Sequence, residues 1–194
     1  MTDGSSDLVE HLEDYLGRID VGWTVDADGA QVPFQVARFD GLVSGGVPFA
    51  TIGLSRVKLR SSVSGKRIRQ EFVFLAPPAL ADRSVPGLLQ QVGREIVASG
   101  TALLRGDVIG PRGRLFEEYE MEALYSSNPV YFPDDFAICG SEADGIVMVW
   151  LIPITKAEAR FVAARGWSTF ENKLQNVDPD LVDFSRPGVV AQTR

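Results

Sequence analysis

Apolar residues recur with two different periods along the chain, and these periods predict helices in some segments and strands in others. Residues 7–16 and 85–99 each carry an apolar stripe at helical spacing. Residues 34–39, 49–60 and 67–75 have the composition of strands, and charged and apolar residues alternate in the second half of 49–60. That alternation is typical of a strand with one buried face. We therefore expect two helices and, between them, a group of β-strands.

The later part of the chain contains its most apolar stretch. Residues 146–154 are predominantly apolar, which predicts a central strand buried on both faces with Trp150 in the core. The preceding residues 101–145 predict only short strands between turns. The polar tail from Asp178 onward is expected to lie on the surface.

Two helix starts follow this strand, each marked by a capping-box motif. Thr155 and Glu158 have the spacing at which a hydroxyl and a carboxylate each accept a backbone N–H of the first helical turn. Ser168 and Glu171 repeat that spacing. The motifs predict a pair of consecutive helices near the end of the fold.

Length and composition indicate one folded domain. The chain has 194 residues, of which 45% are hydrophobic, and this supply suits a single core spanning residues 1–194. A single cysteine, Cys139, cannot form an internal disulfide. The first residues lack the basic and apolar pattern of a signal peptide, and residues 146–154 fall short of the ~20 needed to span a bilayer. We expect a cytoplasmic protein without a membrane segment.

The net charge of −7 is unevenly distributed. Residues 1–55 hold nine acidic and two basic residues, whereas residues 56–114 hold four acidic and eleven basic ones. Residues 115–194 hold thirteen acidic and six basic residues. The simplest interpretation is that the basic middle and the acidic flanks neutralise one another within the fold.

Residues that perform catalysis or bind metals are scarce. The only histidine, His11, is expected on the solvent side of the first helix, and Cys139 is expected to be buried. A structural zinc site needs several such ligands, and no segment matches a phosphate-binding loop. We therefore expect no enzymatic activity, no metal and no cofactor.

Two alternatives remain open. Abundant carboxylates allow an enzyme that uses only carboxylates, for example Glu118 and Asp135. The basic residues of the predicted 56–69 hairpin allow nucleic-acid binding, although the net charge of −7 opposes it. No aromatic residues are interleaved with these bases to stack on nucleotides.

The best candidate for a contact surface is the segment 131–144, in which aromatic residues precede a series of acidic ones. A tyrosine beside carboxylates is a common hot-spot arrangement, and the acidic charge attracts a basic partner. The other interpretation is that Tyr131 and Phe132 belong to the core and the acids merely solvate a turn. The predicted partner-binding residues are Tyr131, Asp134, Asp135, Glu142 and Asp144.

Several segments resemble those of the suppressor-of-fused (SUFU) domain. Residues 50–55 resemble its T-x-G-x-S segment, and residues 69–74 resemble its charged-to-apolar strand. Residues 150–158 resemble its W-L-x-P-I-T-x-x-E signature, and residues 180–186 resemble its D-L…R ending. The similarity extends over about residues 34–190.

This resemblance implies an α+β fold in which a mixed, mostly antiparallel β-sheet has helices packed against it and ends in a helix pair. The chain is similar to the short bacterial members, which are proposed to be immunity proteins that bind and neutralise a cognate toxin. It implies a protein partner and no catalytic residues, because the family has no agreed ones. The sequence leaves the partner's identity and the oligomeric state open.

Overall fold

The computed structural model describes residues 4–26, 28–80, 84–141 and 144–190. The helices described are α1 (Gly4–Leu16), α2 (Val85–Ser99), α3 (Lys156–Arg165) and α4 (Trp167–Val177). Three short 3₁₀ helices are η1 (Leu54–Arg56), η2 (Pro78–Leu80) and η3 (Asp134–Ala137). The strands are β1 (Ile19–Val25), β2 (Gln31–Phe39), β3 (Val47–Ile52), β4 (Leu59–Arg60), β5 (Arg67–Ala76), β6 (Val108–Ile109), β7 (Met121–Ser127), β8 (Ile138–Cys139) and β9 (Ile146–Thr155). No described helix is both long and apolar enough to cross a membrane.

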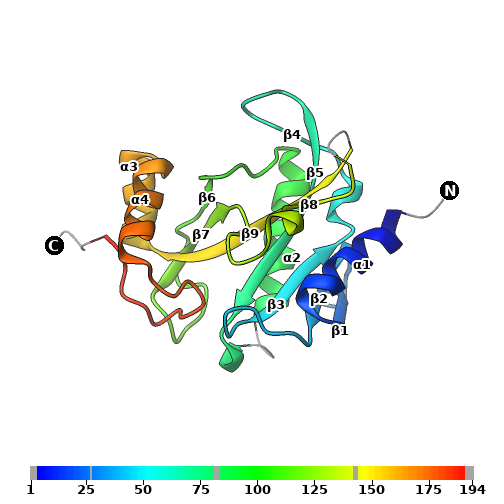
Figure 1. Ribbon diagram of the computed structural model, residues 1–194, viewed down its shortest axis with the longest axis horizontal. Helices are drawn as coiled ribbons and strands as arrows, with labels where there is room; N and C mark the ends of the chain where they lie inside the picture. Colours follow the sequence, from blue (N-terminus) through cyan, green and yellow to red (C-terminus); the bar gives the residue numbers. More distant parts are fainter. Residues whose placement is uncertain (1–3, 27, 81–83, 142–143, 191–194) are drawn as a thin grey trace. The chain divides into compact units, whose positions relative to one another are not determined.

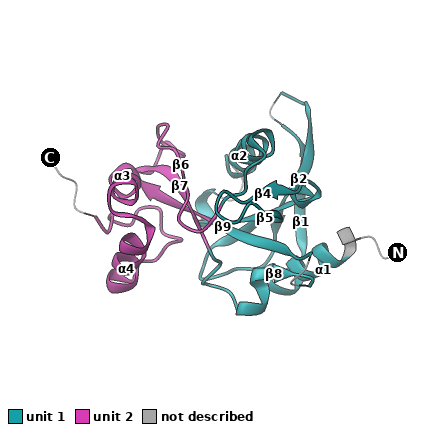
Figure 2. Cartoon of the chain, turned by 90° about the horizontal axis from the view of Figure 1, so that it is seen from above, with its two compact units in different colours: residues 1–103, 128–150 teal, residues 104–127, 151–194 magenta. Residues whose placement is uncertain are grey.

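The chain folds into two compact units, each made of two chain segments (Figures 1 and 2). Residues 1–103 and 128–150 form the first unit, and residues 104–127 and 151–194 form the second. Strand β9 contributes its first residues to one unit and its last residues to the other. The organisation as one domain over residues 1–194 stays a prediction.

The first unit is built on an antiparallel series of strands in the order β1-β2-β3-β5. Strand β9 then joins β5 in parallel, with Arg69 opposite Ile146 and Val73 opposite Trp150. In the second unit, β7 follows β9 in the sheet order, and β6 pairs with β7 in antiparallel orientation. The predicted α+β class, with a mixed and mostly antiparallel sheet and a final helix pair, is confirmed.

Both faces of the first unit's sheet are covered, which explains the long apolar runs. The stripe of Leu8, Leu12 and Leu16 on α1 packs on a face that includes Ala37 and Phe39 of β2. Helix α2 lies against the other face, on strands β2, β3 and β5. A strand between two helical layers needs apolar residues on both sides, and residues 70–76 of β5 are all buried.

Close contact between α2 and β2 requires a glycine at position 93. A Cβ atom added to Gly93 would lie 2.3 Å from the Cζ of Phe34, whereas one added to Gly87 in the same helix would have no heavy atom within 4 Å. We expect Gly93→Ala to lower the free energy of unfolding by about 1–3 kcal/mol through overpacking. Gly87→Ala should be neutral or stabilising by up to about 1 kcal/mol, because alanine favours helix. Urea unfolding of both variants tests this, and an equal effect would contradict it.

The second unit buries residues that were expected at the surface. In the tail, Leu181, Val182 and Phe184 are all buried, and the Phe184 ring stacks on Phe116 with 5.7 Å between centroids. The Tyr125 ring of β7 meets Phe170 of α4 edge-on at 5.2 Å. The prediction that the tail from Asp178 merely covers the surface is therefore wrong. Its apolar residues complete the core of this unit.

Candidate functional site

Tyr131 and Phe132, the first two residues of the predicted contact segment 131–144, are half-buried. The Tyr131 ring lies 4.7 Å from the ring of Trp150, and the Phe132 ring stacks 4.3 Å from that of Phe136. Both side chains therefore pack against the interior of the first unit. The alternative interpretation, in which Tyr131 and Phe132 are core residues, thus holds for the buried part of each side chain.

The two carboxylates that follow are presented to solvent by η3. Asp134 and Asp135 occupy its first turn and are exposed, while Phe136 beneath them is fully buried. The Phe136 ring stacks on His11 at 5.6 Å and contacts Tyr15 at 5.2 Å. Neither aspartate forms an ion pair within the described part of the chain. The acidic turn is thus charged, exposed and fixed on an aromatic cluster.

His11 differs from the expectation of a solvated surface residue. Its imidazole is half-buried, and its Nε2 lies 3.0 Å from the carbonyl oxygen of Phe136. Because a carbonyl can only accept, Nε2 donates this hydrogen bond. His11 joins α1 to η3, and the surface prediction is wrong. Cys139 is 6% exposed as expected, and its pKa is raised by burial first and by the charge of Asp7 second.

The remaining predicted acids have different surroundings. Asp144 is exposed but accepts from Lys58 at 3.1 Å and pairs with Arg69 at 3.3 Å. The Lys58 hydrogen bond, followed by the charges of Arg69 and Lys58, lowers the pKa of Asp144. Glu142 lies outside the described residues. The basic 56–69 segment and the acidic loop thus neutralise one another here, as the charge distribution suggested.

The carboxylates proposed for the catalytic alternative are divided between the two units. Glu118 lines a groove of ≈ 530 Å³ in the second unit together with Glu120. Asp135 belongs to the first unit, on the exposed turn of η3. Neither compact unit by itself brings the pair together. No group of three or more His, Cys, Asp or Glu side chains suitable for a metal occurs among the described residues.

The T-x-G-x-S segment forms a cradle for a buried carboxylate. Glu71 is 0% exposed and accepts hydrogen bonds from the hydroxyl of Thr51 at 2.6 Å and the N–H groups of Gly53 at 2.8 Å and Ser55 at 3.0 Å. The Thr51 hydroxyl also accepts the N–H of Phe72 at 2.8 Å. Burial raises the pKa of Glu71, and the hydrogen bonds from Thr51, Ser55 and Gly53 offset that rise only in part.

This cradle also changes the predicted secondary structure. The expected long strand 49–60 ends at Ile52, because Gly53 adopts a left-handed conformation with φ of 96° and the chain turns into η1. The turn points three successive N–H groups at Glu71 instead of at a neighbouring strand. The strand prediction is wrong over 53–58, and pairing resumes at β4.

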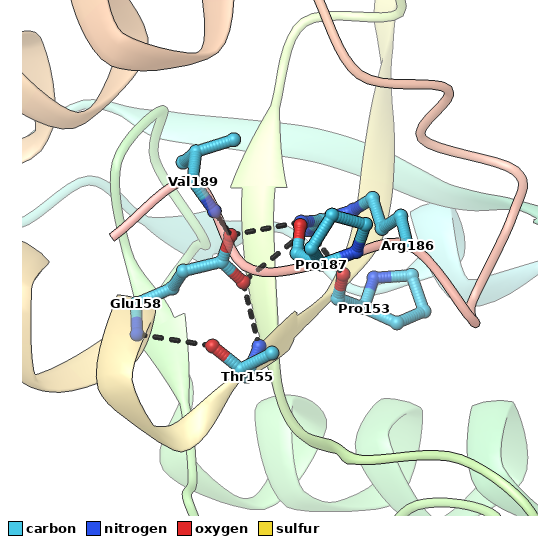
Figure 3. A network of polar contacts seen from close by, with 6 residues as sticks. All are labelled: Pro153, Thr155, Glu158, Arg186, Pro187 and Val189. Carbon is cyan, nitrogen blue, oxygen red and sulfur yellow. Dashed lines mark hydrogen bonds and ion pairs between the residues drawn. The ribbon is translucent and has the colours of Figure 1, made fainter. Parts of the chain in front are cut away.

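The second signature forms a buried ion pair in the second unit (Figure 3). Arg186 donates to Glu158 at 2.8 and 3.3 Å and to the carbonyl oxygen of Pro153 at 3.3 Å. Glu158 also accepts the N–H of Thr155 at 2.7 Å and of Val189 at 3.0 Å. The side chains of Arg186 and Glu158 are 3% and 0% exposed. The capping box predicted at Thr155 and Glu158 is confirmed.

Opposing effects act on the pKa of Glu158. Burial raises it most strongly among the individual causes, but the hydrogen bonds and charge of Arg186, with the N–H groups of Thr155 and Val189, together outweigh burial. The pKa of Glu158 therefore lies below its ordinary value, and the carboxylate is ionised when paired. This network joins the start of α3 to the C-terminal tail.

The second predicted capping box does not form. Helix α4 begins after Gly166 without a side-chain cap. Glu171 instead pairs with Arg105 and accepts the hydroxyl of Tyr125 at 2.8 Å. Burial first, and then Glu171, raise the pKa of Tyr125. The helix pair itself is confirmed, but its second helix starts by a different mechanism.

Comparison with known proteins identifies the family of this fold. The sequence profile of the suppressor of fused protein family (SUFU) matches residues 30–187. No curated protein sequence matches the chain significantly.

Solved structures with similar folds include a SUFU homolog from Neisseria gonorrhoeae FA 1090, with 18% identity and a TM-score of 0.74 over 97% of this chain and 98% of that one. The Sufu-Fu complex matches with 16% identity and a TM-score of 0.68 over 96% of this chain and 92% of that one. Drosophila Suppressor of Fused matches with 16% identity and a TM-score of 0.61 over 95% of this chain, which corresponds to 50% of that chain. The match over residues 30–187 shows that the chain belongs to the suppressor-of-fused family.

Proposed function

We propose that this chain is a protein-binding domain whose contact surface is centred on the acidic turn Asp134–Asp135. The observation that carries the proposal is that both carboxylates are exposed and unpaired in the described structure, on a turn fixed by the buried ring of Phe136. Fixed, unneutralised charge attracts an oppositely charged partner over a long range and increases the association rate. The exposed part of Tyr131, three residues before Asp134, belongs to the same segment.

The structural roles of the buried carboxylates support a binding function rather than a catalytic one. Glu71 and Glu158 are the fully buried acids in the described part of the chain, and each is surrounded by hydrogen-bond donors of the fold. A general acid or base needs an atom that can reach a substrate proton. These two carboxylates are committed to holding segments of the chain together. A related structure is named as the Sufu-Fu complex, so a protein of this fold has been found together with another protein.

We infer further that the partner is a toxin neutralised by this chain, as is proposed for the short bacterial family members. A toxin that acts on nucleic acid has a basic substrate site, because it must hold phosphates. An acidic, rigid turn resembles that substrate in charge and can occupy the site. A neighbouring gene for a large secreted toxin supports neutralisation, whereas a metabolic operon counts against it.

A capture experiment with a charge-matched control tests the surface. We expect Asp134→Asn with Asp135→Asn to reduce capture of the partner from an extract of the source cell about tenfold, and more strongly at low salt. The control is Glu117→Gln with Asp178→Asn, which removes the same charge from exposed acids of the second unit. The control variant should capture the partner as the wild type does.

Two outcomes distinguish the parts of the proposal. Undiminished capture by the Asp134 and Asp135 variant, at low and at physiological salt, excludes this turn as the contact surface. A captured partner that is not toxic on expression, or whose toxicity the chain does not relieve, excludes neutralisation while leaving protein binding in place.

A further inference from the structure

A groove in the second unit has the opposite charge from the rest of the chain. It has a volume of ≈ 740 Å³ and lies over α3 and α4, within the size range of ~300–1,000 Å³ that is common for ligand sites. Its charged lining consists of five bases and two acids, namely Arg114, Lys156, Arg160, Arg165, Lys173, Glu120 and Glu122. All of them belong to the second unit. A net charge of +3 is therefore concentrated here in a chain whose net charge is −7.

Ion pairs within the groove account for only part of its charge. Arg114 pairs with Glu120 and Lys156 with Glu122, each at 3.8 Å. The other three bases, Arg160, Arg165 and Lys173, have no ion pair within the described chain. Surface charges are normally interspersed with charges of opposite sign, so three neighbouring unpaired bases indicate an anionic partner.

Helix stability explains one of these bases but not the group. Arg165 occupies the last turn of α3, where a positive charge stabilises the helix by interacting with its dipole. Arg160 lies in the middle of α3 and gains nothing from that effect. Lys173 comes from α4 and places its Nζ 5.5 Å from the ring centre of Phe161, within range for a cation–π contact. The two helices thus direct their bases to the same groove.

Part of the groove's lining is apolar. Ala157, Phe161 and Ala164 line it at the i, i+4 and i+7 positions of α3, which share one helix face. Val190 of the tail lines it as well. A groove lined by both apolar residues and bases matches a peptide that carries carboxylates on either side of an apolar side chain.

The spacing of the bases favours a peptide over a small anion. Lys156 and Arg165 are separated along α3 by roughly 13 Å, at 1.5 Å per residue. A single phosphate or small dicarboxylate cannot reach across that length, whereas about four residues of extended chain can. We propose that this groove binds an acidic peptide segment of another protein, with an apolar residue of that segment resting on Ala157, Phe161 and Ala164.

This site is independent of the acidic turn at Asp134–Asp135, and failure of one proposal leaves the other intact. Single-stranded nucleic acid is the competing anionic polymer. The glutamates in the groove wall and the overall charge of −7 oppose a uniformly charged phosphate backbone. A peptide can place its carboxylates beside the bases and avoid Glu120 and Glu122.

Selection from a random peptide library displayed on phage, with the full chain immobilised, tests the inference. We expect enrichment of peptides in which several Asp or Glu residues flank an apolar residue. A fluorescein-labelled synthetic copy of the most enriched peptide is then titrated by fluorescence anisotropy. Arg160→Gln with Arg165→Gln should weaken its binding by about tenfold or more, and Lys173→Gln should weaken it by a smaller factor.

The matched control is Arg56→Gln with Arg60→Gln, which removes the same charge from exposed bases of the first unit. It should change the affinity by less than about twofold, and thermal unfolding confirms that all variants remain folded. Enrichment without an acidic preference overturns the proposal, as does binding that the Arg160 and Arg165 variant leaves unchanged. A labelled single-stranded DNA oligonucleotide that binds more tightly than the peptide and depends on the same bases overturns it in favour of a nucleic-acid site.

Discussion

Replacing Arg186 by methionine is expected to lower the free energy of unfolding by about 3–5 kcal/mol, the typical cost of removing one partner from a buried ion pair. Methionine keeps much of the side-chain volume but leaves the Glu158 carboxylate, which is 0% exposed, without its cation. The tail also loses its contact with the carbonyl oxygen of Pro153. Urea unfolding followed by circular dichroism measures the loss.

The dependence of this loss on pH identifies its cause. In the wild type the pKa of Glu158 is lowered on folding, so its stabilising contribution is present above the ordinary carboxyl pKa and is lost as the pH falls through the lowered value. Without Arg186, burial dominates and raises that pKa, so the charged form opposes folding at neutral pH. The difference between Arg186→Met and wild type should therefore be largest near neutral pH and shrink as the solution is acidified.

A double variant serves as the control for the buried charge. Adding Glu158→Gln to Arg186→Met removes the unpaired charge and should recover part of the lost stability at neutral pH. It should also abolish most of the pH dependence of the difference. A loss below about 1 kcal/mol in Arg186→Met, or one that is equal at all pH values, would show that the pair does not hold the tail.

Local patterns in the sequence predict the elements whose contacts are themselves local. The predicted helix 85–99 coincides with α2, and the predicted strand 67–75 differs from β5 only at its last residue. Thr155 and Glu158 form their capping box because both partners lie within one helical turn. Periodicity and caps are properties of neighbouring residues, and sequence alone records them.

The incorrect predictions of the second capping box and of the strand 49–60 have a common physical cause. In both segments, residues distant in sequence compete for the same hydrogen-bonding groups. Ser168 and Glu171 have the same spacing as the first capping box, but Glu171 is taken by Arg105 and Tyr125 from other segments. The alternation in 49–60 is that of a strand, yet Glu71 from β5 accepts the N–H groups that a strand would use for pairing. No local pattern reveals which distant group will compete.

Contacts between residues distant in sequence also limit what can be predicted of the candidate site. The sequence identifies the acidic character of the segment 131–144 but does not show that Asp144 is paired with Lys58 and Arg69. Only the folded structure distinguishes this paired acid from Asp134 and Asp135, which form no ion pair among the described residues. The linear charge distribution does not reveal the groove over α3 and α4, because four of its five bases lie within the acidic last third of the chain. The side chains of the two buried networks lie in the segments that resemble the family, but the resemblance assigned no role to them.

Trp150→Ala is expected to lower the free energy of unfolding by about 3–5 kcal/mol, as is typical for removing a large aromatic side chain from a core. Trp150 is 1% exposed, lies opposite Val73 in the parallel β5–β9 pair, and supports the ring of Tyr131 at 4.7 Å. The lost contacts leave a cavity that the sheet, covered on both faces, cannot fill by collapsing. Urea unfolding followed by far-ultraviolet circular dichroism measures the loss without depending on tryptophan fluorescence.

Trp167→Ala is the matched control, because the same side chain is deleted from a site that is 42% exposed. Its ring contacts the guanidinium of Arg105 at 5.0 Å, so its removal should cost no more than about 1–2 kcal/mol. Equal losses in the two variants would contradict the central role of Trp150.

The same pair of variants also tests the contact surface. Because Trp150 supports the ring of Tyr131, Trp150→Ala should weaken partner capture at the acidic turn if the exposed edge of Tyr131 contacts the partner. Trp167→Ala should leave that capture unchanged.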